Sequence, residues 1–153
     1  MIRIASLLDS YENVRLDVDV TSKKRVFEVA SEIIENGTGI DKKTIFDALI
    51  ARERLGSTGL SGLFAIPHAR IAELTAPYLA LIRTKDPVEF DGAENNLARF
   101  FFVMALPADA TEDYLSILSQ IASLIGEQTN RDALLGASGA LGVCQLISNW
   151  EPV

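Results

Sequence analysis

The chain has 153 residues, of which 48% are apolar, and its formal net charge is −7 at pH 7. Length and apolar content fit one packed domain over residues 1–153 and exclude a disordered chain. The negative charge argues against nucleic acid or an anionic membrane surface as a partner. One histidine and one cysteine cannot build a histidine–cysteine zinc cage or an internal disulfide, so we expect no metal and no cofactor. No apolar run is long enough for a bilayer span or a secretory signal, which indicates a soluble protein of a reducing compartment.

The N-terminal part of the chain predicts a strand followed by a helix. Residues 4–8 favour a short helical turn packed on the core. Apolar and charged side chains alternate over residues 14–20, a pattern that predicts a half-buried strand. Thr21 or Ser22 then caps a helix, and we expect that helix to end at Gly37 because glycine is typical of helix ends.

The basic run Lys23-Lys24-Arg25 occupies the first turn of this helix, where the helix dipole disfavours cations. The simpler explanation is a solvated helix end. The alternative is a docking site for an acidic surface of a partner protein.

Asp41 is expected to cap a second helix that runs to about residue 54. Arg52 lies in its last turn, where a cation suits the helix dipole, and this alone would explain the residue. The functional alternative is that Arg52 faces His68 across a glycine-rich turn at residues 56–59. The expected buried stripe of this helix is Ile45, Phe46, Leu49 and Ile50.

The second half of the chain predicts strands and then helices. Strands are expected at residues 78–82, 88–90 and 97–106, and helices from residue 111, near residues 131–135 and at about residues 139–149. The segment 97–106 is apolar on both faces, which indicates a central strand covered by helices on both sides. This order of elements predicts an α/β (α+β) fold, a three-layer α/β/α sandwich with a mixed central β-sheet.

Two side-chain patterns in the C-terminal part indicate core positions. Cys144 lies in an apolar helical pattern and is interpreted as a small core residue. The buried stripe of the helix from residue 111 is expected to be Tyr114, Leu115, Leu118, Ile121, Ala122 and Ile125.

The only histidine, His68, follows Pro67 and a short apolar run at residues 63–66. Proline fixes its own φ and favours an extended conformation for the preceding residue. The segment therefore predicts a strand that ends at Pro67 and presents the imidazole at its tip. Near neutral pH much of an ordinary imidazole is the uncharged nucleophile, which suits covalent catalysis. A lone histidine is more often structural, and that alternative is open at this point.

Transfer of a phosphoryl group to this histidine would require hydrogen-bond donors around the phosphoryl oxygens. An arginine guanidinium can bind two such oxygens at once, and Arg52 and Arg70 are the local candidates. Ser57, Thr58 and the backbone amides of the turn at residues 56–59 could add neutral donors.

The segments ARERLGSTG at residues 51–59 and AIPHAR at residues 65–70 closely resemble the signature of phosphotransferase-system IIA domains of the mannitol/fructose type. The branch that looks nearest is the nitrogen-regulatory, PtsN-like one. The likeness continues in SKKR, PVEFD and LPADAT at residues 22–25, 87–91 and 106–111, and covers about residues 7–148.

This resemblance implies a fold, a reaction and partners. It implies a mixed sheet flanked by helices, in a protein of the bacterial cytoplasm. It makes His68 the acceptor of a phosphoryl group from the histidine of a small HPr-like carrier, and Arg52 the arginine that stabilises that group. In the nitrogen-regulatory branch, the protein then binds targets such as potassium transporters or sensor kinases according to its phosphorylation state.

Three positions differ from the pattern of that family. Ala69 follows the histidine where glycine is usual, and Ser61-Gly62-Leu63 replaces glycine-asparagine-glycine. Tyr114 stands where many members carry a second active-site histidine. Its hydroxyl could donate to a phosphate but cannot become cationic; equally, Tyr114 could be a core residue only. These departures leave an alternative open, a non-catalytic interaction module with a weakened phosphoryl-transfer site.

Overall fold

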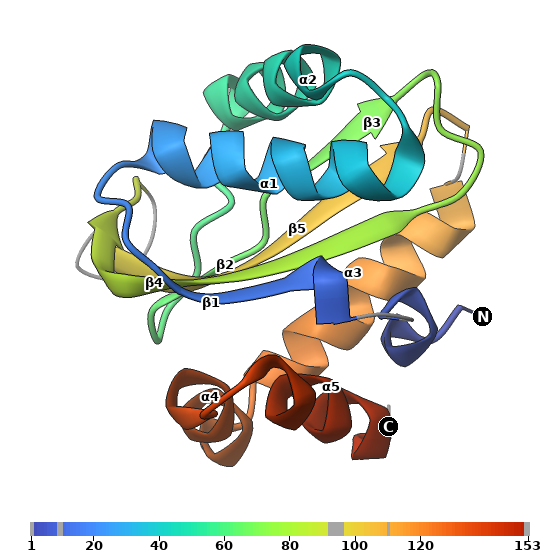
Figure 1. Cartoon of the computed structure of the whole chain (residues 1–153). Coiled ribbons are helices and arrows are strands. Elements are labelled where there is room, and N and C mark those ends of the chain that lie inside the picture. Colours follow the sequence, from blue (N-terminus) through green and yellow to red (C-terminus); the bar gives the residue numbers. More distant parts are fainter. Residues whose placement is uncertain (1, 9–10, 92–96, 110, 152–153) are drawn as a thin grey trace.

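A computed structural model describes residues 2–8, 11–91, 97–109 and 111–151 (Figure 1). Its elements are, in chain order, η1 (Ile4–Leu7), η2 (Tyr11–Asn13), β1 (Val14–Val18), α1 (Lys23–Thr38), α2 (Lys42–Leu55), β2 (Phe64–Ala65), β3 (His68–Ile71), β4 (Tyr78–Glu89), β5 (Leu97–Pro107), α3 (Thr111–Ile125), α4 (Gln128–Gly136) and α5 (Ala140–Asn149). The predicted order of a strand, two helices, several strands and further helices is confirmed. None of the described helices is both long and apolar enough to cross a membrane.

The strands form one mixed sheet in the order β1-β4-β5-β2, and β3 also pairs with β5. β4 and β5 are antiparallel, whereas β1 runs parallel to β4, and β2 and β3 run parallel to β5. β5 therefore has a hydrogen-bonded neighbour on each side, as its apolar sequence predicts. The mixed sheet of the predicted fold class is confirmed.

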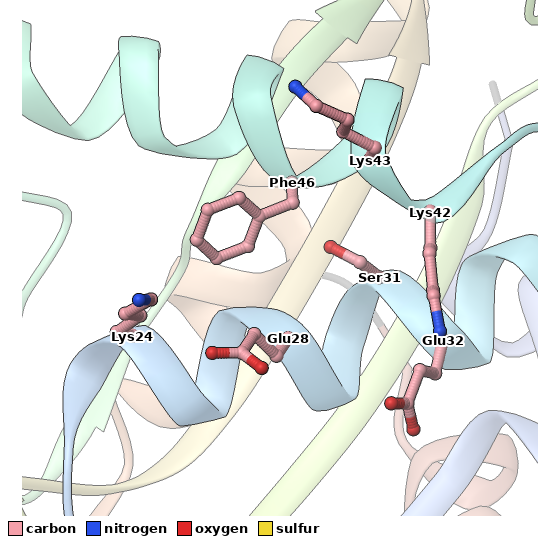
Figure 2. A pocket seen from close by; sticks show the side chains of 7 residues that line it. All are labelled: Lys24, Glu28, Ser31, Glu32, Lys42, Lys43 and Phe46. Carbon is pink, nitrogen blue, oxygen red and sulfur yellow. The ribbon is translucent and has the colours of Figure 1, made fainter.

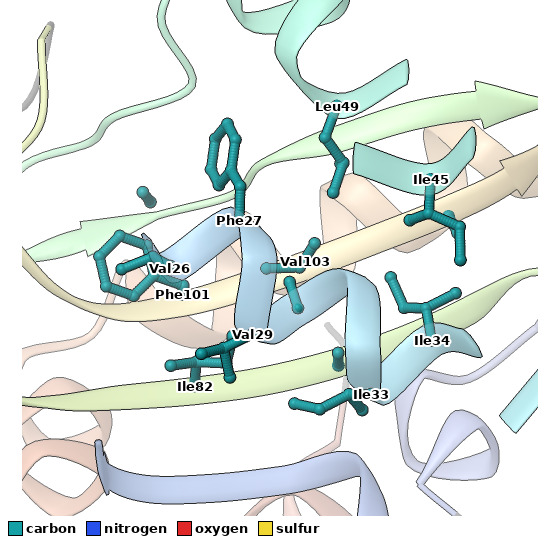
Figure 3. Close-up of a cluster of buried hydrophobic side chains, with 14 of the residues drawn as sticks. Val26, Phe27, Val29, Ile33, Ile34, Ile45, Leu49, Ile82, Phe101 and Val103 are labelled. Carbon is teal, nitrogen blue, oxygen red and sulfur yellow. The ribbon is translucent and has the colours of Figure 1, made fainter. Parts of the chain in front are cut away.

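Helices α1 and α2 cover one face of the sheet, and α3, α4 and α5 lie on the other (Figure 1). Side chains along β5 alternate between the two faces, as the pleat of a strand requires. Phe101, Val103 and Ala105 belong to the core beneath α1 and α2, which Figure 3 shows in part. Phe100 and Phe102 belong to the core on the side of α3, together with buried Cys144, whose predicted core position is confirmed.

Helix α1 begins and ends with local signals that the sequence carries. Its N-cap is Ser22, whose hydroxyl accepts a hydrogen bond from the Arg25 amide at 3.2 Å. The expected end at Gly37 is wrong, because the helix continues to Thr38 and ends at Gly39, which has a φ of +77°. Gly37 serves packing instead: a Cβ at this position would overlap the side chain of Tyr78.

The predicted strands at residues 78–82 and 88–90 are one continuous strand, β4. Its register with β5 shifts between Arg83 and Val88, so the intervening charged residues and Pro87 interrupt the pattern without ending the strand. Arg99 bridges the irregular stretch, since its Nε donates to the Thr84 carbonyl oxygen at 2.9 Å. Strand β1 ends at Val18, two residues before the predicted end.

The two predicted helix stripes are correct only in part. In α2, Ile45 and Leu49 are buried, whereas Phe46 and Ile50 are half-buried. In α3, Leu115 is 62% exposed and Ala122 is also exposed. Ile121 and Ile125 are buried as predicted, and Tyr114 and Leu118 are half-buried. Ile117, Gln120 and Leu124 are also buried, although the prediction did not include them.

Candidate functional site

A strand, β2, ends before Pro67 as predicted, but His68 is not a bare strand tip, because it begins a further strand, β3. Pro67 separates two short strands that both run parallel to β5, with Ala65 opposite Phe101 and His68 opposite Met104. Proline has no amide to donate, but its carbonyl oxygen accepts a hydrogen bond from the Met104 amide at 2.9 Å. The interruption between β2 and β3 at Pro67 is therefore hydrogen-bonded to β5, and this bond fixes the position of the His68 backbone.

The half-buried imidazole of His68 has one ring nitrogen engaged and one free of any described partner. Its Nδ1 lies 2.7 Å from the carbonyl oxygen of Ile66. A carbonyl can only accept, so Nδ1 carries the proton in the neutral ring and Nε2 holds the lone pair. Burial lowers the pKa of His68; the hydrogen bond to Ile66 opposes this shift, and the Arg52 cation adds to it. The neutral, nucleophilic form of the ring is therefore favoured near neutral pH.

The histidine lines a hollow of about 400 Å³ between the end of α2, β3 and the start of α3. Arg52, Arg70 and Tyr114 line the same hollow, so the structure brings four of the predicted site residues together. The walls are completed by Ala48, Ala51, Leu55 and Ala69.

Arg52 comes from the last turn of α2, and both explanations of this residue fit its position. Its Nη1 donates to the carbonyl oxygen of Gly56 at 2.8 Å, which satisfies an acceptor at the end of the helix. The same half-buried guanidinium lines the hollow beside His68 and lowers the pKa of that imidazole. A single cation thus serves the helix end and the candidate site.

Tyr114 packs its ring against the site from α3. The ring centroids of His68 and Tyr114 are 5.4 Å apart, at an interplanar angle of 67°. The guanidinium of Arg70 lies 5.2 Å from the tyrosine ring centre and also donates to the carbonyl oxygen of Ala108 at 2.7 Å. Burial raises the pKa of Tyr114, while the cations of Arg52 and Arg70 oppose that shift. Tyr114 also packs against the core on the α3 side, so its position suits both alternatives that the sequence leaves open.

Ser57 and Thr58 do not line the hollow in this arrangement. Thr58 is buried, and its amide and hydroxyl donate to the two carboxylate oxygens of Glu53 at 3.0 and 2.8 Å. The Ser57 hydroxyl accepts a hydrogen bond from the Gly59 amide at 3.1 Å. Both side chains therefore organise the turn between α2 and β2.

Sequence reasoning missed Glu53. The residue is only 9% exposed, and its carboxylate is paired with Lys23 at 3.0 Å in addition to the two bonds from Thr58. This ion pair accounts for the cation at the start of α1, and Arg25 is likewise paired with Glu28. The signal available in the sequence was the coincidence of an unfavourable lysine in a first turn with a glutamate beside a candidate arginine.

A second hollow, of about 330 Å³, lies between α1 and α2 on the outer side of the helical layer (Figure 2). Its lining carries charges of both signs around one aromatic ring: Lys24, Glu28, Ser31, Glu32, Lys42, Lys43 and Phe46. The hydroxyl of Ser31 donates to the carbonyl oxygen of Phe27 at 2.7 Å, and no histidine lines this hollow. The histidine hollow is therefore the stronger candidate for covalent chemistry. Among the described residues, no cluster of histidine, cysteine and acidic side chains could hold a metal ion.

Comparisons with known proteins agree on one family. The family model described as the phosphoenolpyruvate-dependent sugar phosphotransferase system, EIIA 2, matches residues 8–150. A nitrogen regulatory protein of Pseudomonas aeruginosa is 36% identical over 148 residues, which cover 96% of this chain and 96% of the relative. The crystal structure of nitrogen regulatory protein IIA-Ntr from Neisseria meningitidis matches with a TM-score of 0.89 and 35% identity, over 94% of this chain and 98% of that one. The mannitol IIA protein of Escherichia coli, at 18% identity, has the same fold, with a TM-score of 0.77 over 90% of this chain and 97% of that one.

Proposed function

Since the chain belongs to the EIIA 2 family of the phosphoenolpyruvate-dependent sugar phosphotransferase system, we propose that residues 1–153 form one domain that carries a phosphoryl group on His68. The observation that carries this proposal is the hydrogen bond from Nδ1 of His68 to the Ile66 carbonyl oxygen, at 2.7 Å. It leaves Nε2 as the nucleophilic nitrogen of a ring that lines a hollow with two arginines.

The transfer is a displacement between two imidazoles. The lone pair on Nε2 of His68 forms a bond to the phosphorus atom of a phosphohistidine on a small HPr-like carrier. The nitrogen–phosphorus bond of the donor breaks, and its electron pair returns to the donor ring. The proton on Nδ1 of His68 stays in its hydrogen bond, so the reaction needs no external base and no cofactor.

Arg52 and Arg70 are proposed to neutralise the charge that arrives with the phosphoryl oxygens. Both guanidinium groups line the hollow with His68, and a guanidinium fork fits two phosphoryl oxygens. Tyr114 is the proposed neutral donor from α3. Leu55, which is 86% exposed at the margin of the hollow, offers apolar contact to the incoming carrier.

We further propose that phosphorylation changes which proteins the chain binds. Relatives at 36% and 30% identity over nearly the whole chain are named nitrogen regulatory protein. Targets such as potassium transporters or sensor kinases would then distinguish a hollow holding a neutral imidazole from one holding a phosphate dianion. The proposed location is the cytoplasm, where an HPr-like donor is found.

Intact-mass measurement after incubation with an HPr-like phosphodonor tests the proposal. We expect one added phosphoryl group on the wild type and none on the His68→Ala variant. Phosphate that still adds to the variant would refute the assignment of His68. A wild-type chain that remains unmodified yet retains a partner would support the second candidate, a non-catalytic interaction module, which the substitutions at Ala69, Leu63 and Tyr114 favour.

A further inference from the structure

A buried carboxylate, that of Glu53, anchors the turn that precedes the candidate phosphoryl acceptor. The side chain of Glu53 is 5% exposed, and it is paired with Nζ of Lys23 at 3.0 Å. Its two oxygens also accept the amide and hydroxyl of Thr58, at 3.0 and 2.8 Å. Charge-assisted bonds of this kind are the strong ones in proteins, and a buried charge without its partner is costly. The position of Thr58 relative to α1 and α2 is therefore closely fixed.

The segment anchored at Thr58 runs alongside the strand that leads to His68. The Thr58 carbonyl oxygen accepts the Ile66 amide at 3.0 Å, and Gly59 forms an antiparallel bridge with Ala65. The carbonyl oxygen of Ile66 in turn holds Nδ1 of His68 at 2.7 Å. A continuous series of hydrogen bonds thus leads from the first turn of α1 to the imidazole.

The same anchor fixes the other side of the hollow. Arg52 directly precedes Glu53 in the last turn of α2 and donates to the Gly56 carbonyl oxygen at 2.8 Å. Lys23 reaches this region from α1, where its Nζ also lies 4.3 Å from the ring centre of Phe90. Loss of the ion pair would detach Glu53 from α1 and leave a buried carboxylate without its cation, at the start of the segment that separates Arg52 from His68.

We propose that Lys23 and Glu53 are positioning residues, which act through Thr58 and Ile66 to hold His68 in the tautomer that leaves Nε2 free to accept a phosphoryl group. The part that concerns phosphoryl transfer rests on the proposed function. The part that concerns the tautomer does not, because it is a property of the unmodified ring.

The chain offers a direct readout, since His68 is its only histidine and the nitrogen NMR spectrum of the imidazole contains one residue. The variants are Glu53→Gln and Lys23→Met, with Lys23→Arg as the conservative variant that keeps both the charge and the contact with Phe90. Asp17→Asn is the matched control. Asp17 pairs with buried Arg83 at 3.1 Å, and neither residue lines the hollow.

In the wild type we expect the Nδ1-protonated tautomer to predominate. In Glu53→Gln and Lys23→Met, we expect the ratio of the Nδ1-protonated to the Nε2-protonated form to fall about three- to tenfold, as for the loss of part of one hydrogen bond. The initial rate of phosphoryl transfer should fall about tenfold, because a misplacement of 1 Å can cost on the order of 100-fold. Lys23→Arg should restore both quantities, and Asp17→Asn should change neither.

An unchanged tautomer ratio in folded Glu53→Gln and Lys23→Met would overturn the proposal, and so would an equal change in Asp17→Asn. If Glu53→Gln does not fold, the tautomer ratio of Lys23→Met alone tests the proposal. This variant keeps both bonds from Thr58 to Glu53, so we expect it to fold. A wild type that takes up no phosphate would refute the proposed function, while the tautomer comparison would still decide the role of Lys23 and Glu53.

Discussion

Two ion-paired clusters interrupt the apolar interior, and they differ in which partner is buried. At the site, the buried member is an anion, Glu53, whose side chain is 5% exposed and which meets Lys23 from α1. Beside α4, the buried member is a cation, Arg83, whose side chain is 4% exposed and which meets Asp17 from β1. The first cluster is connected to the His68 imidazole by hydrogen bonds through Thr58 and Ile66. In the second cluster, Arg83 donates to backbone carbonyl oxygens of α4.

The difference teaches that burial of a charge does not by itself mark a functional site. Arg83 donates to the carbonyl oxygens of Leu134 and Leu135 at 3.0 and 3.2 Å, so it fastens α4 to the sheet. Its Asp17 partner also meets Arg99 at 3.4 Å, and these two arginines lower the pKa of Asp17. None of Asp17, Arg83 and Arg99 lines the hollow that contains His68.

The largest effect is expected from Arg83→Met, which breaks the cluster beside α4. It removes the donor from one buried and one partly buried carbonyl oxygen of α4, and it leaves Asp17 without its main partner. We expect the free energy of unfolding to fall by about 3 kcal/mol, from unsatisfied buried groups. Denaturant unfolding measures this loss, and NMR of the His68 ring should show an unchanged tautomer. A tautomer shift here would erase the distinction between the two clusters.

The next effect is expected from Arg52→Met, which leaves both buried charges in place and removes the guanidinium from the hollow. We expect the rate of phosphoryl transfer to fall on the order of 100-fold, as for the loss of one preorganised donor. The free energy of unfolding should change by less than about 1 kcal/mol, since the bond to the Gly56 carbonyl oxygen is exposed and the hydrogen bond with the Tyr114 hydroxyl comes from a half-buried guanidinium. Single-turnover labelling and denaturant unfolding would check the two halves separately. A variant that labels at the wild-type rate would contradict the role of Arg52.

Most helices and strands could be predicted from the sequence because the signals that define them are local or periodic. The alternation around residues 14–20, the Ser22 and Asp41 caps and the doubly apolar β5 each depend on near neighbours. The end of α1 was mispredicted because Gly37 is required for packing against Tyr78, a residue far along the chain, and not for ending the helix. The continuation of β4 past Pro87 likewise depends on a separate segment, because Val88 and Glu89 pair with Ala98 and Leu97 of β5.

The candidate site was predictable where a motif keeps its residues close in sequence, and less so elsewhere. His68, Arg52 and Arg70 lie within the motif segments and meet in one hollow; Tyr114, which lines the same hollow, is distant in sequence and was suggested only by the family resemblance. The role of Thr58 depends on Glu53, and that of Glu53 on Lys23, which is distant in sequence. The contact between Lys23 of α1 and Glu53 of α2 joins residues that are distant in sequence, so it produces no periodic pattern or motif spacing from which it could be predicted.

A smaller effect is expected from Tyr114→Phe, which tests how far the site cluster extends into α3. The ring contact with His68 is retained and only the hydroxyl is lost. If the hydroxyl donates to the bound phosphate, phosphorylated His68 should decay about two- to tenfold faster, in proportion to one hydrogen bond. Timed loss of the phosphate by intact mass measures the lifetime. An unchanged lifetime assigns Tyr114 to packing alone, and the Arg83→Met chain provides a control with a destabilised fold and an intact tyrosine.

The smallest effect concerns pH, and it distinguishes the clusters by the pH range in which stability changes. Burial and the Arg52 cation hold the pKa of His68 below 6.5, although the Ile66 hydrogen bond and the Glu53 carboxylate oppose the shift. Arg70 and Tyr114 face the same ring. The folded chain therefore binds fewer protons at this site than the unfolded chain, so stability falls as pH decreases from 6.5 toward the folded pKa and is level below it.

Unfolding measured across this pH window should show that slope in the wild type and lose it in His68→Gln. The NMR titration of the single imidazole gives the folded pKa directly. Glu53→Gln should lower that pKa further, because it removes the one nearby charge that favours the imidazolium, whereas Asp17→Asn should leave it unchanged. Asp17 acts in the same direction but in a more acidic window: because its pKa is also lowered, stability falls as pH decreases from the ordinary aspartate value of 3.8 toward the folded pKa. A His68 pKa at or above 6.5 would mean that the Ile66 bond and Glu53 outweigh burial and the Arg52 cation, and would contradict the lowered pKa of this ring.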